Sequence, residues 1–125
     1  MKLLLLIAIG GAIGSIARYL LSSQTYSILG SYFPYGTLVV NVLGAFLIGI
    51  ISMIITERFS GYAMELRGLL LIGFLGGFTT FSSFSLETMN LLENGQLSYA
   101  LLNIVGSVVL CLIATWLGLM LGRAL

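Results

Sequence analysis

The residues best suited to chemistry in this sequence form one run, GGFTTFSSFSLE at positions 76–87, inside an apolar stretch between Leu69 and Met89. The stretch is long enough to cross a bilayer, and an interrupted backbone at that depth must have its polar groups satisfied by protein, ion or water. Carbonyl oxygens freed by a helix break are the usual ligands for Na⁺ in discontinuous membrane helices. Phenylalanine rings have a positive edge, so rings presented edge-on could hold a partly dehydrated anion. This combination suits a very small anion.

The three phenylalanines of the run, Phe78, Phe81 and Phe84, lie three residues apart, which on a helix places them near one another along one side. Aromatic residues at helical spacing are also common in an ordinary packed core. The spacing by itself leaves both interpretations open.

Two further stripes of polar residues lie inside apolar segments, where burial is costly unless the groups are paired or line a wet cavity. One starts at Asn41, and the other at Asn103. Their members recur at helical spacing: Asn41, Ala45, Gly49, Ser52 and Thr56, then Asn103, Ser107, Cys111 and Thr115. Such ladders could pass a solute along hydroxyls, or they could serve hydrogen bonding between helices.

The charged residues near these segments also allow two interpretations each. Arg18 could attract anions into a vestibule, or its side chain could extend to the headgroups. Glu87 could be a proton or cation site, or a hydrogen-bonded structural carboxylate. The sequence has no His and a single Cys, Cys111, so it offers neither a disulfide framework nor a side-chain site for zinc or iron. Without a paired carboxylate or a nucleophile beside a base, an enzyme is not expected.

Composition identifies the environment that must hold these residues. Hydrophobic residues make up 59% of the 125 positions, charged residues 7%, and the mean hydropathy is +1.15. Four stretches approach the roughly 20 residues needed to cross the hydrocarbon core, at residues 3–21, 38–55, 66–89 and 99–121. We therefore expect an all-α membrane protein of one domain, with four transmembrane helices and a broken third helix. The net charge of +1 excludes a nucleic-acid-binding surface.

The connections and their charges predict the topology. We expect a loop at residues 22–37, a short connection at 57–65 and a turn at Glu93-Asn94-Gly95. The basic residues favour cytoplasmic termini, with a mixed orientation left open. Four basic residues are expected on the side of the termini, namely Lys2, Arg58, Arg67 and Arg123, and only Arg18 on the opposite side.

Small residues recur four apart, which puts each pair on one helical face: Gly10 and Gly14, Ala45 and Gly49, Gly73 and Gly77, and Gly118 and Gly122. Each pair could serve helix packing within the subunit or contact with another subunit. Four helices can hardly enclose a pathway by themselves, so we expect an oligomer.

From end to end the chain resembles the CrcB/Fluc family of fluoride channels. The resemblance rests on GGAIGSIARY at 10–19, on YGTLVVN at 35–41 with Gly44 behind it, on the run at 76–87, and on the size with four spans. It implies a passive, fluoride-selective channel in the cell (inner) membrane of a prokaryote, built as an antiparallel dual-topology homodimer with two pores. Whether a paired homologue completes a heterodimer stays open.

The resemblance also implies roles for individual residues. Gly76 and Thr79 match the positions whose backbone carbonyls, from both subunits, hold a central structural Na⁺ that is not transported. Phe81 and Phe84 match the rings that coordinate fluoride by their edges. Asn41 matches the pore asparagine, and hydroxyls along the path are matched by Thr80, Ser82, Ser83 and Ser107. Arg18 matches a cation near an entrance, and Glu87 matches a carboxylate near the polar track. Two positions depart from the family pattern. The family has Tyr or Ser at the position of Asn103, and Ser at the position of Cys111.

Two rival functions come from other classes of membrane protein. A small four-helix multidrug or guanidinium exporter would be expected to carry a Glu in its first helix, where this chain has only Arg18. A non-transporting membrane scaffold would explain the glycine pairs but not the hydroxyl residues of 76–87. Protection of cells against fluoride, against cationic toxins or against neither would distinguish the three.

Overall fold

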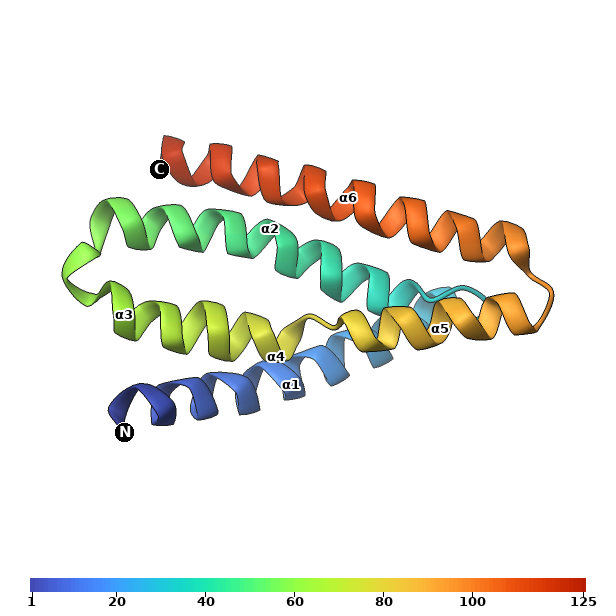
Figure 1. The fold of residues 1–125 in the computed structure, drawn as a ribbon, viewed down its shortest axis with the longest axis horizontal. Coiled ribbons are helices and arrows are strands. Elements are labelled where there is room, and N and C mark those ends of the chain that lie inside the picture. The colour runs from blue at the N-terminus through green and yellow to red at the C-terminus, as the bar shows by residue number, and fades with distance from the viewer.

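The computed structural model describes all 125 residues, and the chain is helical apart from its end residues, three short connections and one interruption (Figure 1). Helices α1 (Lys2–Leu29), α2 (Tyr35–Arg58) and α6 (Leu97–Ala124) are continuous. The third span consists of five pieces: η1 (Ser60–Tyr62), α3 (Ala63–Leu66), the π-helical η2 (Arg67–Leu75), α4 (Gly76–Phe78) and α5 (Phe81–Glu93). All four spans are long and apolar enough to cross a membrane, which confirms the all-α, multi-pass membrane fold.

The four spans lie side by side with alternating direction, and both termini lie at the same end (Figure 1). Most of their large apolar side chains are exposed, as expected where helices face lipid. The buried apolar core is small and centres on Val40, Leu75 and Phe78, at the level of the interruption.

The first connection is shorter than the sequence indicated. The expected loop at residues 22–37 is wrong, because α1 continues to Leu29 and α2 begins at Tyr35. Hydroxyl side chains in this stretch donate hydrogen bonds to backbone carbonyls of their own helix. Thr25 Oγ1, for example, donates to Leu21 O at 2.8 Å. The helix ends at Gly30, whose φ of 87° suits glycine, and Pro34 precedes α2. The turn at residues 93–95 is confirmed, with Gly95 at a φ of 75°.

Glycines set the two closest helix contacts, one between α1 and the third span and one between α2 and α6. A Cβ atom on Gly14 would overlap Phe74 O, and one on Gly77 would approach Gly11 O at 2.6 Å. On the other side, a Cβ atom on Gly118 would overlap Phe46 O. These glycines therefore pack helices within the subunit, which was the first of the two interpretations.

Candidate functional site

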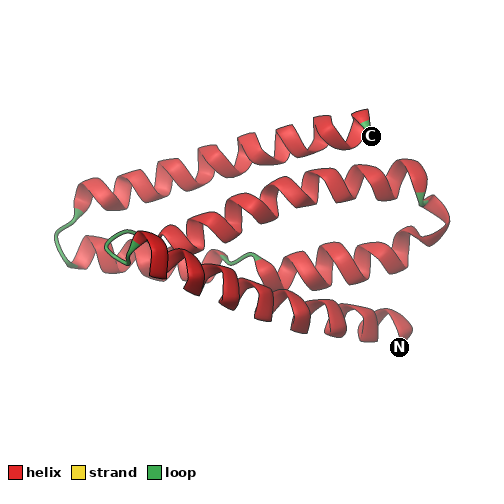
Figure 2. Cartoon of the chain, turned by 180° about the vertical axis from the view of Figure 1, so that it is seen from behind, coloured by secondary structure: helices red, strands yellow, loops and turns green.

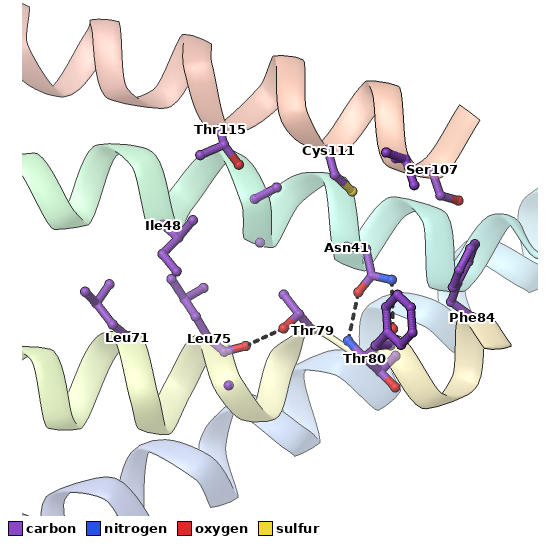
Figure 3. A pocket seen from close by; sticks show the side chains of 15 residues that line it. Asn41, Ile48, Leu71, Leu75, Thr79, Thr80, Phe84, Ser107, Cys111 and Thr115 are labelled. Carbon is purple, nitrogen blue, oxygen red and sulfur yellow. Dashed lines mark hydrogen bonds between the residues drawn. The ribbon is translucent and has the colours of Figure 1, made fainter. Parts of the chain in front are cut away.

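The regular backbone of the third span stops between α4 and α5, where Thr79 (φ −86°, ψ 161°) and Thr80 (φ −153°, ψ 120°) are extended. Figure 2 shows this stretch as a short loop in the middle of the span. Asn41 of α2 pairs with it twice, because its Nδ2 donates to Thr80 O at 2.9 Å and its Oδ1 accepts from Thr80 N at 2.8 Å (Figure 3). One side-chain amide thus pairs with both the N–H and the C=O of a residue that has left the helix.

The interruption leaves two carbonyl groups without their α-helical donors, through two separate hydrogen bonds. In an α-helix, Gly76 O would accept from Thr80 N, and Thr79 O would accept from Ser83 N. Thr80 N instead donates to Asn41, and Ser83 N donates to Thr80 Oγ1 at 3.2 Å. Gly76 and Thr79 therefore each lose their α-helical donor, and these are the two residues whose carbonyls the sequence predicted as cation ligands. The ligand role itself stays a prediction.

Hydroxyl groups gather at the start of α5. Thr80 is the N-cap of this helix, and its Oγ1 lies 3.3 Å from Ser82 Oγ and donates to Ser83 Oγ at 3.2 Å. Thr79 Oγ1 donates back to Leu75 O at 2.9 Å. The predicted hydroxyl pathway residues Thr80, Ser82 and Ser83 thus form one hydrogen-bonded cluster beside the interruption.

The phenylalanines separate into two groups. Phe81 and Phe84 face each other with ring centroids 5.3 Å apart and a 50° angle between their planes. Phe78 instead stacks on Phe74 and is buried in the core, so placing all three rings together was wrong. The extended residues between Phe78 and Phe81 break the helical repeat, which turns the later rings to another direction. Phe81 is 76% exposed.

Asn41, Thr80, Phe81 and Phe84 border one groove with a volume of about 410 Å³, whereas the predicted pathway residues Ser82 and Ser83 are not among its lining residues (Figure 3). One wall comes from α2, one from the third span and one from α6. Its polar lining includes Asn41, Thr79, Thr80, Ser107, Cys111 and Thr115, and its other lining residues include Gly76, Phe81 and Phe84. Asn103 is absent from this lining because it is buried behind the groove, with 2% of its surface exposed. The polar stripe that begins at Asn103 therefore divides in two. Ser107, Cys111 and Thr115 line the groove, and Asn103 bonds to a neighbouring helix. The stripe on α2 divides too, since Gly49 packs against α6.

Arg18 and Glu87 border a second, smaller cavity of about 250 Å³ that reaches Thr80 and Ser83 from the side of α1. Thr37 Oγ1 donates to Glu87 Oε1 at 2.7 Å, and Glu87 Oε2 is buried without a partner. The sequence did not single out Thr37, although it lies one helical turn before Asn41. Because α1 is longer than expected, Arg18 lies well inside this helix rather than near its end.

Comparison with known proteins places the chain in a family. Residues 5–119 match the family described as CrcB-like protein, Camphor Resistance (CrcB). A fluoride-specific ion channel FluC from Geobacter sulfurreducens is 54% identical over 125 residues, which cover 100% of both chains. Similar proteins of the same name come from Geobacter metallireducens, 55% identical over 95% of both chains, and from Magnetococcus marinus, 52% identical over 94% of both chains. This extent of similarity shows that the chain belongs to the CrcB family.

Proposed function

We propose that this protein is a fluoride-selective ion channel, and not an enzyme, through which cytoplasmic fluoride leaves the cell. The observation that carries the proposal is the groove lined by Gly76, Thr79, Thr80, Phe81 and Phe84, where two phenylalanine rings and two threonines adjoin a backbone interruption. These are the groups expected to replace the hydration shell of a small anion. Membership in a family whose relatives are named fluoride-specific ion channels supports the same function.

A second copy of the chain, in antiparallel orientation, completes the channel in this proposal. The groove opens to the outside of the subunit, Phe81 is largely exposed, and a Cβ atom on Gly76 would meet no atom of another span within 4 Å. If the exposed Gly76 faced lipid, its carbonyl, which lacks the α-helical donor, would be left unsatisfied. Covering the groove with its own antiparallel copy would bury the break at the subunit interface and create two equivalent pathways.

A structural Na⁺ at that interface fits the residues present. The carbonyls of Gly76 and Thr79 lack their α-helical donors, and carbonyl oxygens are suitable ligands for a hard cation. When bound, the ion would neutralise the carbonyl dipoles of the two breaks and hold the subunits together. It would be a fixed part of the assembly and not a transported species.

Fluoride passes along the rings and hydroxyls and down its electrochemical gradient. Hydrogen fluoride is a weak acid that enters cells as a neutral molecule and dissociates in the near-neutral cytoplasm, which traps the anion. The membrane potential favours anion exit by about 2.3 kcal/mol per charge per 100 mV. No ATP is required. Larger anions such as chloride cannot make the same contacts in a narrow path.

The proposal is tested by fluoride efflux from liposomes that contain the purified protein, measured with a fluoride electrode. We expect rapid efflux in Na⁺ and a slower rate when the protein is reconstituted without Na⁺. Phe81→Ile should lower the rate, because the aliphatic side chain has no positive edge. Phe59→Ile is the matched control, since Phe59 is also exposed but lies in the connection between α2 and η1. No fluoride efflux from the unmodified protein would contradict the proposal.

A growth assay separates the channel from its two rivals. In a fluoride-sensitive bacterial strain, expression should restore growth in fluoride and give no protection against quaternary ammonium or guanidinium compounds. Protection against the cations alone would indicate an exporter. Protection against neither, by protein that is present in the membrane, would indicate a scaffold.

A further inference from the structure

A buried hydrogen-bond chain links α6 to the part of α5 that carries Phe84. Asn103 of α6 donates through Nδ2 to Thr88 Oγ1 at 2.9 Å, and Ser107 Oγ donates to Asn103 Oδ1 at 3.2 Å. Thr88 Oγ1 donates in turn to Phe84 O at 2.7 Å. All three side chains are buried: 2% of the surface of Asn103 is exposed, 6% of Thr88 and 7% of Ser107.

The direction of every hydrogen bond in this chain is determined. Thr88 has one hydroxyl proton, which it gives to Phe84 O, so it must accept from the amide nitrogen of Asn103. That orientation places Asn103 Oδ1 toward Ser107, whose own proton is therefore directed inward. The sequence predicted Ser107 as a hydroxyl donor on the anion path. Because its proton is donated to Asn103, this hydroxyl does not donate into the groove in this structure.

Helix α5 depends on such contacts more than the other helices do. It is a 13-residue helix that follows the extended residues Thr79 and Thr80, so helical continuity with α4 does not set its rotation. Its packing is mainly against α6. Two side-chain hydrogen bonds join it to other helices, from Thr37 to Glu87 and from Asn103 to Thr88. Only the second reaches the backbone of Phe84.

We propose that Asn103 is a positioning residue, whose amide sets where the Phe84 ring lies in the groove and which way the Ser107 hydroxyl points. Phe84 and Ser107 both line the groove, on opposite walls, while Asn103 lies behind them. One buried amide would thus influence a group on each of two walls of the groove, Phe84 on α5 and Ser107 on α6. The inference rests on the proposed function for its effect on transport, but the placement of Phe84 can be measured independently of transport.

The first test measures the ring directly. A 4-fluorophenylalanine is incorporated at position 84, and its ¹⁹F resonance is recorded in the unmodified protein and in Thr88→Val and Asn103→Leu. We expect the resonance to shift or broaden in both variants. Thr25→Val is the matched control, because Thr25 is also buried and donates to its own helix, to Leu21 O at 2.8 Å, without a partner amide. An unchanged resonance in Thr88→Val and Asn103→Leu would overturn the proposal.

The second test measures fluoride efflux and the permeability ratio of fluoride to chloride. Thr88→Val and Asn103→Leu should each lower the efflux rate by about tenfold, because displacement of a positioned group by a fraction of an ångström is costly. The double variant should be no slower than Asn103→Leu, since the two residues act through one hydrogen bond. Additive losses in the double variant, or an effect of Thr88→Val no larger than that of Thr25→Val, would contradict the positioning role. Absence of efflux in the unmodified protein would instead contradict the proposed function and leave the ¹⁹F result to decide the inference.

Discussion

At the scale of single residues, the polar side chains in these spans do two different kinds of work. Asn41 is half-buried and lines the groove, and its amide pairs with both the N–H and the C=O of Thr80. Asn103 is buried and engages hydroxyls on two helices. Both asparagines therefore support the groups that border the groove. Within the ladder that begins at Asn103, interhelical hydrogen bonding is shown for Asn103, and Ser107, Cys111 and Thr115 line the groove; their part in a solute pathway stays a prediction.

The role of Asn41 predicts the effect of a nearly isosteric change. Asn41→Asp keeps an acceptor for Thr80 N but removes the donor to Thr80 O and places a negative charge beside that carbonyl. An unpaired buried carbonyl costs about 1–3 kcal/mol, so we expect unfolding at a lower temperature in detergent. Efflux should fall by at least about tenfold as the break loses its shape. A variant with unchanged thermal stability and efflux would show that the amide pairing is dispensable.

At the scale of helices, much of the architecture could be predicted from the sequence. Hydropathy located all four spans because each must present apolar side chains to lipid. The end of α1 could not be located this way, since Ser22, Thr25 and Ser27 look like loop residues but bond to carbonyls of their own helix. The burial of Phe78 in the core could not be predicted from the sequence either. Its direction relative to Phe81 depends on the backbone angles of two threonines, which residue types do not specify.

Helix packing predicts opposite effects for two glycines. Gly14→Ala should destabilise the protein by about 1–3 kcal/mol, because the added methyl would overlap Phe74 O of the facing helix, which cannot move aside alone. Gly106→Ala meets no atom within 4 Å in the subunit and should stabilise α6 slightly, by up to about 1 kcal/mol. Thermal unfolding of both variants in detergent, read by circular dichroism, checks the prediction.

Gly106 also reports on the assembly. A Gly106→Ala variant that unfolded as readily as Gly14→Ala would show that Gly106 lies in a tight contact with another subunit. That result would redefine the interface, because the proposed dimer uses the groove beside Gly76.

At the scale of the whole molecule, the groove and the small internal core fit the proposed dimer, in which a single chain would be half of the channel. The four spans bury few large side chains of their own, and the exposed Phe81 and the two carbonyls of Gly76 and Thr79 lie at one open groove. Lys2, Arg58, Arg67 and Arg123 lie toward the end of the molecule that holds both termini, and Arg18 lies within α1. So few basic residues give a weak preference for one orientation, which is compatible with insertion in both directions.

The antiparallel arrangement predicts a specific labelling pattern. Gly61 and Ser98 are exposed and lie near opposite ends of the molecule, in η1 and at the start of α6 (Figure 1). Each is changed to cysteine in a Cys111→Ser background, and intact cells are treated with a membrane-impermeant maleimide. If the chain inserts in both orientations, about half of the copies should be labelled at either position. Full labelling at one position and none at the other would exclude dual topology.

Gly61 accepts the new side chain without a clash, since a Cβ atom there meets nothing within 4 Å. Labelling after the cells are permeabilised gives the total for each position, so a low value in intact cells reports orientation and not poor reactivity.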